Sequence, residues 1–239
     1  MLAHAPAQEA AWAWLRSAAA APSGLVSVPL SGQPGLCAVC RGLARPGCAR
    51  CYQCELHAQA APGGLADLVV PVAYAPKGGP HARNLWLYKS GRPGAAAASA
   101  ALRALLLAFL HDHGRCVWRR AAISGPTRLA VVPSGRGRPG PHPLRSLVAP
   151  YLTGQWADLS PRAGGDRARD LDPGRFAAPP LPGERVLLLD DTWTSGASAQ
   201  SAAMSLRLAG AHCVLVIVLG RHVAAIPAAA RSPGPGYIG

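Results

Sequence analysis

The sequence predicts an α/β fold: a mostly parallel sheet flanked by helices, with a small cysteine-rich module in front of it. Two continuously apolar runs, residues 186–189 and 213–220, are typical of strands that are buried on both faces. Such runs alternate with stretches of helical periodicity, which is the pattern of parallel strands joined by crossover helices. Five of the seven cysteines lie between positions 37 and 54, ahead of this alternating region.

Length and composition set the outer limits. The chain has 239 residues, enough for one α/β domain with a small appendage or for two small domains. Half of the residues are hydrophobic, which argues against bulk disorder. The formal net charge is +13, and a basic protein attracts polyanions such as nucleic acid and nucleotides. Only Lys77 and Lys89 are lysines, so the coding bias of a GC-rich genome explains the excess of arginine equally well.

The sequence shows neither a signal peptide nor a membrane span, which favours a cytoplasmic protein. Residues 1–22 contain Glu9, lack a basic start and carry Trp12 and Trp14 where a signal peptide needs an unbroken apolar run. The most apolar long segment, residues 95–110, is interrupted by Arg103, so we expect a core helix and no membrane span.

The cysteines at 37–54 have the spacing C-x2-C-x7-C-x2-C-x2-C, and two C-x-x-C pairs predict a tetrahedral zinc site. Without an export signal, disulfides are the weaker interpretation. The first pair is Cys37 with Cys40. The second is Cys51 with Cys54 or Cys48 with Cys51, and we favour Cys51 with Cys54 because the longer gap gives the chain room to turn back. Cys48 is then a spare thiol and His57 a weaker alternative ligand. Four thiolates leave no open position, so the Zn²⁺ is expected to be structural.

The remaining elements follow from periodicity and from Gly and Pro. We expect strands at 65–74, 128–134, 184–190 and 213–220, helices at 81–90, 94–114 and 198–211, a partly helical stretch at 143–152, and no regular structure at 153–184. Gly114 is expected to end the second helix. The predicted organisation is an N-terminal extension and linker (1–36), a zinc-ribbon-like module (37–62), an α/β domain (65–222) and a flexible tail (223–239).

The segment VLLLDDTWTSGAS, residues 186–198, carries the clearest functional signal. Its strand delivers Asp190 and Asp191 to the carboxyl edge of the sheet, where ligands bind in such folds. The small residues that follow let backbone N–H groups and a helix N-terminus surround a phosphate group. The two carboxylates suit vicinal sugar hydroxyls. Together they predict a site for a 5-phosphorylated ribose.

This segment closely resembles the phosphoribosyl pyrophosphate (PRPP) motif of type I phosphoribosyltransferases. With the cysteine module in front, the chain looks like the ComF family of competence-associated bacterial proteins over residues 37–222. The resemblance implies PRPP contacts from Asp190, Asp191, Thr192, Thr194, Ser195, Gly196, Ala197 and Ser198, with Mg²⁺ on the pyrophosphate. It places a pyrophosphate loop at Ser134, Gly135 and Arg136, a mobile loop carrying Arg167, Arg169 and Arg175, and a lysine near the nucleotide end at Lys89. For the three mobile-loop arginines, solvated surface charge is the alternative interpretation.

The chain departs from the family pattern at three places: GRGRPGPHPLR replaces an Arg-Gly-aromatic-Asn-Gln stretch, Asp172 stands where Asn is more usual, and Trp193 interrupts the phosphate motif. The sequence assigns no catalytic residue and no acceptor base. The predicted function is PRPP or nucleotide binding with phosphoribosyl transfer, linked to DNA uptake. The alternative is a non-catalytic PRPP or nucleotide sensor, or a DNA-binding protein that uses the same fold and the zinc ribbon. Single-stranded DNA, the competence machinery and a second copy of the chain remain open as partners.

Overall fold

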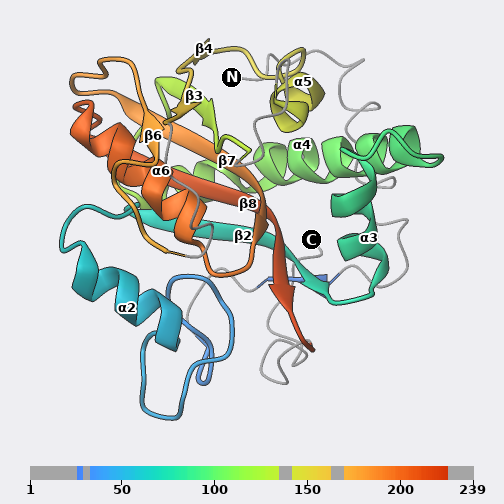
Figure 1. The fold of residues 1–239 in the computed structure, drawn as a ribbon, viewed down its shortest axis with the longest axis horizontal. Coiled ribbons are helices and arrows are strands. Elements are labelled where there is room, and N and C mark those ends of the chain that lie inside the picture. Colours follow the sequence, from blue (N-terminus) through green and yellow to red (C-terminus); the bar gives the residue numbers. More distant parts are fainter. Residues whose placement is uncertain (1–25, 29–32, 135–141, 163–169, 226–239) are drawn as a thin grey trace.

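A six-stranded sheet forms the centre of the molecule in the computed structural model, which describes residues 26–28, 33–134, 142–162 and 170–225 (Figure 1). In spatial order its strands are β1 (Val26–Ser27), β2 (Leu68–Pro76), β8 (Cys213–Val223), β7 (Arg185–Trp193), β3 (Arg128–Val131) and β4 (Gln155–Trp156). The five strands from β2 to β4 are mutually parallel, whereas the edge strand β1 is antiparallel to β2. The prediction of a mostly parallel sheet is confirmed. A small second sheet pairs β5 (Ser160–Pro161) with β6 (Phe176–Ala177).

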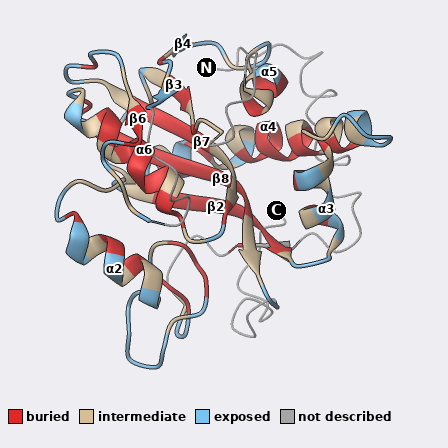
Figure 2. Ribbon diagram, in the orientation of Figure 1, coloured by how far each residue is buried: buried red, intermediate tan, exposed pale blue. Residues whose placement is uncertain are grey.

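Helices cover both faces of the sheet, and the central strands are buried between them (Figure 2). One face packs against α3 (Pro80–Leu87), α4 (Ala95–Arg120) and α5 (Pro143–Val148). The other packs against α6 (Ala197–Leu208) and against cysteines of the N-terminal module, whose helix is α2 (Tyr52–Ala60). The cysteine module therefore lies on the same face of the sheet as the helix that follows the VLLLDDTWTSGAS segment.

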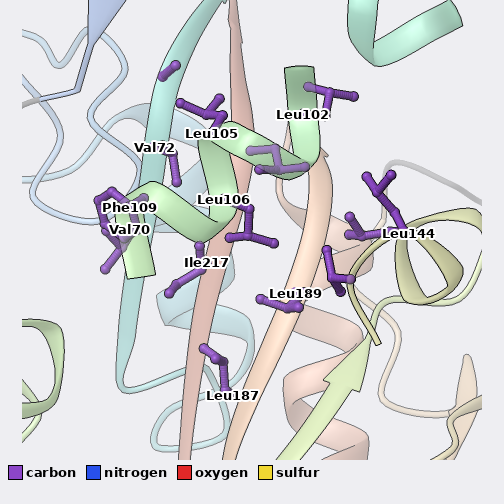
Figure 3. Packing of buried hydrophobic residues seen from close by; sticks show 14 of the residues in the cluster. Val70, Val72, Leu102, Leu105, Leu106, Phe109, Leu144, Leu187, Leu189 and Ile217 are labelled. Atoms are coloured by element: carbon purple, nitrogen blue, oxygen red, sulfur yellow. The ribbon is translucent and has the colours of Figure 1, made fainter. Parts of the chain in front are cut away.

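Side-chain alternation along β7 divides the core into two layers. Leu187 and Leu189 pack into the layer that includes α4, together with Leu106 and its neighbours (Figure 3). Val186 and Leu188 point the other way, into the layer shared with α6. Each such aliphatic side chain contributes about 1.5–3 kcal/mol when fully buried, so the unbroken apolar run at 186–189 is explained by burial on both faces.

The order of the strands creates a topological switch point between β3 and β7. The chain leaves β3 through α5 and runs outward to the edge strand β4, whereas it leaves β7 through α6 and runs to β8 on the opposite side. The two connections cross opposite faces of the sheet. In open α/β sheets, ligands bind in the crevice at the carboxyl ends of the strands at such a point. The segments that leave β3 and β7 are those predicted to hold pyrophosphate and the 5-phosphate.

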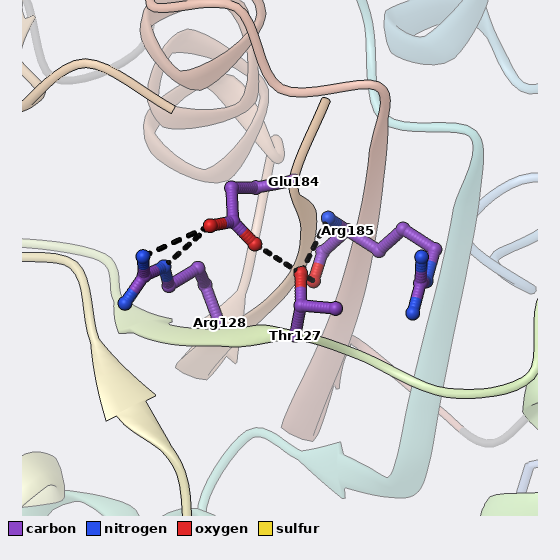
Figure 4. Close-up of polar contacts among 4 residues, drawn as sticks. All are labelled: Thr127, Arg128, Glu184 and Arg185. Atoms are coloured by element: carbon purple, nitrogen blue, oxygen red, sulfur yellow. Dashed lines mark hydrogen bonds and ion pairs between the residues drawn. The ribbon is translucent and has the colours of Figure 1, made fainter. Parts of the chain in front are cut away.

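A polar network ties the amino ends of β3 and β7 together (Figure 4). Glu184 accepts a hydrogen bond from Thr127 Oγ1 and pairs with the Arg128 guanidinium at 2.9 Å. The Arg185 backbone N–H in turn donates to Thr127 Oγ1 at 2.9 Å. The network lies at the edge opposite the candidate site, so its role is to hold the register of the two strands.

The structure differs from the sequence prediction at several elements. Helix α4 continues through Gly114 to Arg120, because Trp118 packs over the glycine and Val117 is buried behind it. Three short strands, β4 to β6, interrupt the stretch expected to be irregular. Strand β7 extends to Trp193, so both aspartates lie inside it.

Helix α4 is long and apolar enough to cross a membrane by length and composition alone. In the structure, Leu102, Leu105, Leu106 and Phe109 instead pack this helix against the sheet (Figure 3). It is therefore a core helix of the α/β domain, as the interruption by Arg103 predicts.

Candidate functional site

The four predicted cysteines come together in one cluster. The Sγ atoms of Cys37, Cys40, Cys51 and Cys54 all lie within 4.8 Å of one another. The Cys40 and Cys51 sulfurs are 3.7 Å apart, which matches the sulfur–sulfur spacing of about 3.8 Å that tetrahedral zinc with 2.3 Å bonds requires. The donor set and its spacing therefore fit a structural metal ion such as zinc.

Local structure explains why each pair presents its thiols. Cys37 and Cys40 lie in a tight turn in which the Cys40 N–H points at the Cys37 sulfur, 3.5 Å away. Cys51 is the N-cap of α2 and Cys54 lies in its first turn, so the positive end of the helix favours both thiolates. Contacts with the other three thiols, first of all Cys37, raise the pKa of the Cys54 thiol. A cation in the centre would reverse this effect.

The choice between the two cysteine pairings is settled by burial and position. Cys48 is exposed and lies outside the cluster, so the second pair is Cys51 with Cys54. His57, the weaker alternative, is buried in α2 and contacts Gln53 through Nε2 at 3.1 Å. It is not part of the four-residue group.

An ammonium group and a hydroxyl group both contact the Asp191 carboxylate. The Lys89 ammonium lies 2.7 Å from Asp191 Oδ2, and the Tyr88 hydroxyl donates to the same oxygen. Burial alone would raise the pKa of this carboxyl, but the charge of Lys89 and hydrogen bonds from Lys89, Tyr88 and Thr192 hold it below its ordinary value. Asp191 is therefore an ionised carboxylate, anchored at the end of α3.

Asp190 has the opposite character. Burial raises the pKa of Asp190 to about 8, and the charge of Asp191 adds to the effect. One carboxylate of the pair is thus poised to hold charge and the other to hold a proton near neutral pH.

The turn after β7 is built around Gly196 and Trp193. Gly196 adopts φ +85° and is the N-cap of α6, and the Ser195 hydroxyl accepts the N–H of Ala197, the first residue of the helix, at 3.3 Å. Trp193 is 1% exposed, and its ring lies so close to Gly196 that a Cβ atom there would overlap it. Trp193 therefore packs beneath the loop and is not available to stack on a base. The loop brings the hydroxyl-bearing residues Thr194, Ser195 and Ser198 to the N-terminus of α6, where an anion site would form.

Replacing Gly196 by alanine should lower the stability of the protein and disturb the loop. The left-handed backbone alone costs alanine about 1–2 kcal/mol, and the Trp193 ring must also move. Gly183 is the matched control, because it has φ +71° but no neighbouring atom within 4 Å of the position that a Cβ would take. In urea unfolding, Gly196→Ala should be less stable than Gly183→Ala by about 1–3 kcal/mol. Equal losses would show that the Trp193 contact does not constrain the loop.

Arg175 and Asp172 connect the segment before β7 to this loop. Arg175 is buried, and its Nη1 donates to Ser198 Oγ at 3.1 Å, which places a guanidinium at the first turn of α6. The interpretation of Arg175 as a solvated surface charge is therefore wrong. Asp172 accepts the Gly174 N–H at 2.8 Å, so this departure from the family pattern closes a turn.

The other predicted binding residues are only partly placed. Ser134 follows shortly after β3. Val132, the first residue beyond the strand, donates its N–H to the Leu189 carbonyl, so Ser134 lies at the same sheet edge as the aspartates. The described residues do not include Gly135, Arg136, Arg167 or Arg169. The pyrophosphate loop and most of the mobile loop therefore remain predictions.

Two residues at the site were missed by sequence reasoning. Tyr88 stands next to Lys89, and its proximity to Asp191 arises only when α3 packs on the sheet. Arg221 follows the apolar run of β8 and reaches the carbonyl oxygens of Trp193 and Thr194. A basic residue at the carboxyl end of a strand next to β7 was the available signal.

No protein-family model matches the chain, and no curated protein matches it. The functional assignment therefore depends on the fold and on the geometry of the site.

Proposed function

We propose that the chain binds a 5-phosphorylated ribose, with PRPP as the main ligand, at the carboxyl edge of β7, and that it is a ComF-like protein with a type I phosphoribosyltransferase fold. The observation that carries the proposal is one continuous segment. Two aspartates follow directly after Leu189, the last residue of β7 that pairs with β3, and a loop with a left-handed glycine then leads into the N-terminus of α6. This segment lies beside the topological switch point of the sheet.

The phosphate half of the proposal is supported by donors and charge. The N-terminus of α6 offers backbone N–H groups and a positive dipole end. Ser198 lies in its first turn and already accepts a hydrogen bond from Arg175. A phosphate at this loop would therefore meet amides, hydroxyls and a nearby guanidinium, which together stabilise a doubly charged group.

The ribose half is supported by the aspartate pair. Carboxylates accept hydrogen bonds from vicinal hydroxyls, and Asp190 and Asp191 lie just ahead of the loop region that would hold the 5-phosphate. Mg²⁺ prefers phosphate oxygens with few protein ligands, so it would enter with the pyrophosphate. The Lys89 ammonium on Asp191 lies where it can also meet the charge of a bound ligand.

Phosphoribosyl transfer is the reaction that we propose for this site. The C1–O bond to pyrophosphate breaks, the pyrophosphate keeps the electron pair, and a bond forms from C1 to a nitrogen of the acceptor, which loses a proton. The chain's part is to position the sugar and to stabilise charge. The alternative is a sensor that binds PRPP or a nucleotide without turnover. The two differ in whether an acceptor base reacts with the bound PRPP.

The cysteine cluster supports a structural role for zinc in this protein. All seven cysteines are free thiols, and four of them converge on a point that a metal would fill. Clustered reduced thiols suit a reducing compartment, so we place the function in the cytoplasm. Competence machinery or single-stranded DNA would be the partner of a ComF-like protein in DNA uptake.

A thermal-shift panel tests the ligand class. Metal-loaded protein would be heated with PRPP and Mg²⁺, ribose 5-phosphate, pyrophosphate, nucleoside monophosphates and single-stranded DNA. A ligand at 100 times its Kd stabilises the folded state by about 2.7 kcal/mol, so PRPP with Mg²⁺ should raise Tm by several degrees. This shift should be larger than the shift with ribose 5-phosphate or with pyrophosphate alone. A shift with DNA alone, falling steeply with salt, would instead favour the DNA-binding alternative. Pyrophosphate release on adding a base separates the transferase from the sensor.

A further inference from the structure

Arg221 lies between the cysteine cluster and the candidate phosphate loop. It occupies the last part of β8, next to Trp193 of β7 in the strand register. On one side its Nε donates to the Cys40 carbonyl at 3.2 Å, and its Nη2 lies 3.4 Å from the Cys40 sulfur. On the other side its Nη1 donates to the Trp193 carbonyl at 3.2 Å and the Thr194 carbonyl at 3.1 Å. One guanidinium therefore contacts a predicted metal ligand and the turn that begins the phosphate loop.

The surroundings show that this contact is built into the fold. Gly42 leaves the space that the Arg221 guanidinium occupies, since a Cβ atom there would collide with Nη2. Cys37, Cys40 and Cys54 also join the hydrophobic layer that contains Trp193 and the buried face of α6. The module and the loop thus share both an apolar contact and a charged side chain.

The chemistry of the contact depends on the metal site. Four thiolates around a divalent cation leave a net negative charge, and a guanidinium beside one sulfur stabilises that charge. Hydrogen bonds to metal ligands hold them in place, and their loss commonly weakens metal affinity by about 10–100-fold. Because the guanidinium is planar and rigid, fixing its Cys40 side also fixes where Nη1 holds the two loop carbonyls.

We propose that Arg221 is a positioning residue that couples occupancy of the cysteine metal site to the conformation of the phosphate loop. Metal binding orders the Cys40 side of the contact, and Arg221 transmits this order to the Trp193–Thr194 turn. Linkage makes the effect reciprocal: a ligand that orders the loop raises metal affinity by the same factor as the metal raises ligand affinity. The ligand part of this statement rests on the proposed function, whereas the coupling of metal to loop does not.

Hydrogen–deuterium exchange of the peptide spanning 193–198 tests the coupling without any ligand. In wild-type protein, removing the metal with a chelator should raise the exchange rate of this peptide by about tenfold, because its local structure would open more often. In Arg221→Met the loop should exchange rapidly with or without metal. Arg221→Lys keeps the charge but not the fork of donors, and should restore metal affinity more than loop protection.

Tyr74→Phe is the matched control. The Tyr74 hydroxyl donates to the Arg41 carbonyl at 2.7 Å, so this variant also removes one contact between module and sheet but leaves Arg221 in place. It should keep the wild-type response of the loop to metal. Loop exchange that ignores metal in the wild type, or that responds equally in wild type and Arg221→Met, would overturn the proposal.

Competition titration supplies a second readout. Zinc affinity of the wild type, measured against a coloured chelator, should exceed that of Arg221→Met by about 10–100-fold. Adding PRPP and Mg²⁺ should tighten zinc binding in the wild type and not in Arg221→Met. Equal zinc affinities for the two proteins would contradict the role of Arg221. A wild type that shows metal-dependent loop exchange but ignores PRPP would overturn the proposed function alone.

Discussion

Cys40→Ser is expected to lose the bound metal and to unfold the cysteine module. A structural zinc site contributes on the order of 10 kcal/mol to the folding of a small module, because the site does not exist in the unfolded chain. Cys40 is fully buried, contacts Cys51 and carries both contacts from Arg221. Its hydroxyl replacement is a poor ligand in a set of thiolates. Metal content should fall from one ion per chain to none, and Tm should fall with it.

The control for this variant is Cys48→Ser. Cys48 is exposed and lies outside the cluster, so this substitution should leave metal content and Tm unchanged. Elemental analysis and calorimetry on the same preparations measure both quantities. Metal retained by Cys40→Ser, or lost by Cys48→Ser, would contradict the assignment of ligands.

The second large effect is a change in how stability depends on pH when Asp190 becomes asparagine. The folded pKa of Asp190 is raised to about 8, well above that of an unfolded aspartate. The contribution of Asp190 to the free energy of unfolding is therefore fully present below about pH 4 and is lost as pH rises through 8. Asparagine cannot ionise, so Asp190→Asn should be more stable than wild type at about pH 8–9 by a few kcal/mol, or several degrees in Tm. The difference should shrink as pH falls towards about 4.

Asp191→Asn should behave in the opposite way. The pKa of Asp191 is held low by Lys89 despite burial, so its contribution is present above the unfolded pKa and is lost as pH falls through the lower folded value. This variant should be less stable than wild type at neutral pH and should approach it in acid. Chemical unfolding of both variants from acid to about pH 9 measures the two trends. Parallel curves for the two variants would refute the division of roles between the carboxylates.

The sequence predicted best where local pattern and burial agree. The apolar run of β7, the aspartates and the glycine before α6 follow each other along the chain, so their arrangement depends on a few neighbouring residues. The cysteine spacing likewise selected the four residues that converge. In both cases the residues that form the site are close together in the sequence.

Long-range contacts could not be predicted in this way. Tyr88 meets Asp191 across 103 positions, and Arg221 meets Cys40 across 181, so only the packed fold brings them together. The edge strand β1 and the short strands β4 to β6 carry too few residues to show a period. Gly114 had the residue type of a helix end, but packing by Trp118 keeps it inside α4.

The central claim is that the VLLLDDTWTSGAS segment binds a 5-phosphorylated ribose. Calorimetric titration of PRPP with Mg²⁺ into metal-loaded protein tests it most directly, with Asp190→Asn plus Asp191→Asn as the paired variant at a pH where both proteins are folded. The account predicts saturable binding of one PRPP per chain to the wild type, weakened by about tenfold or more in the double variant, which loses charged acceptors for the sugar hydroxyls. No binding to the wild type, or equal binding to both proteins, would contradict it.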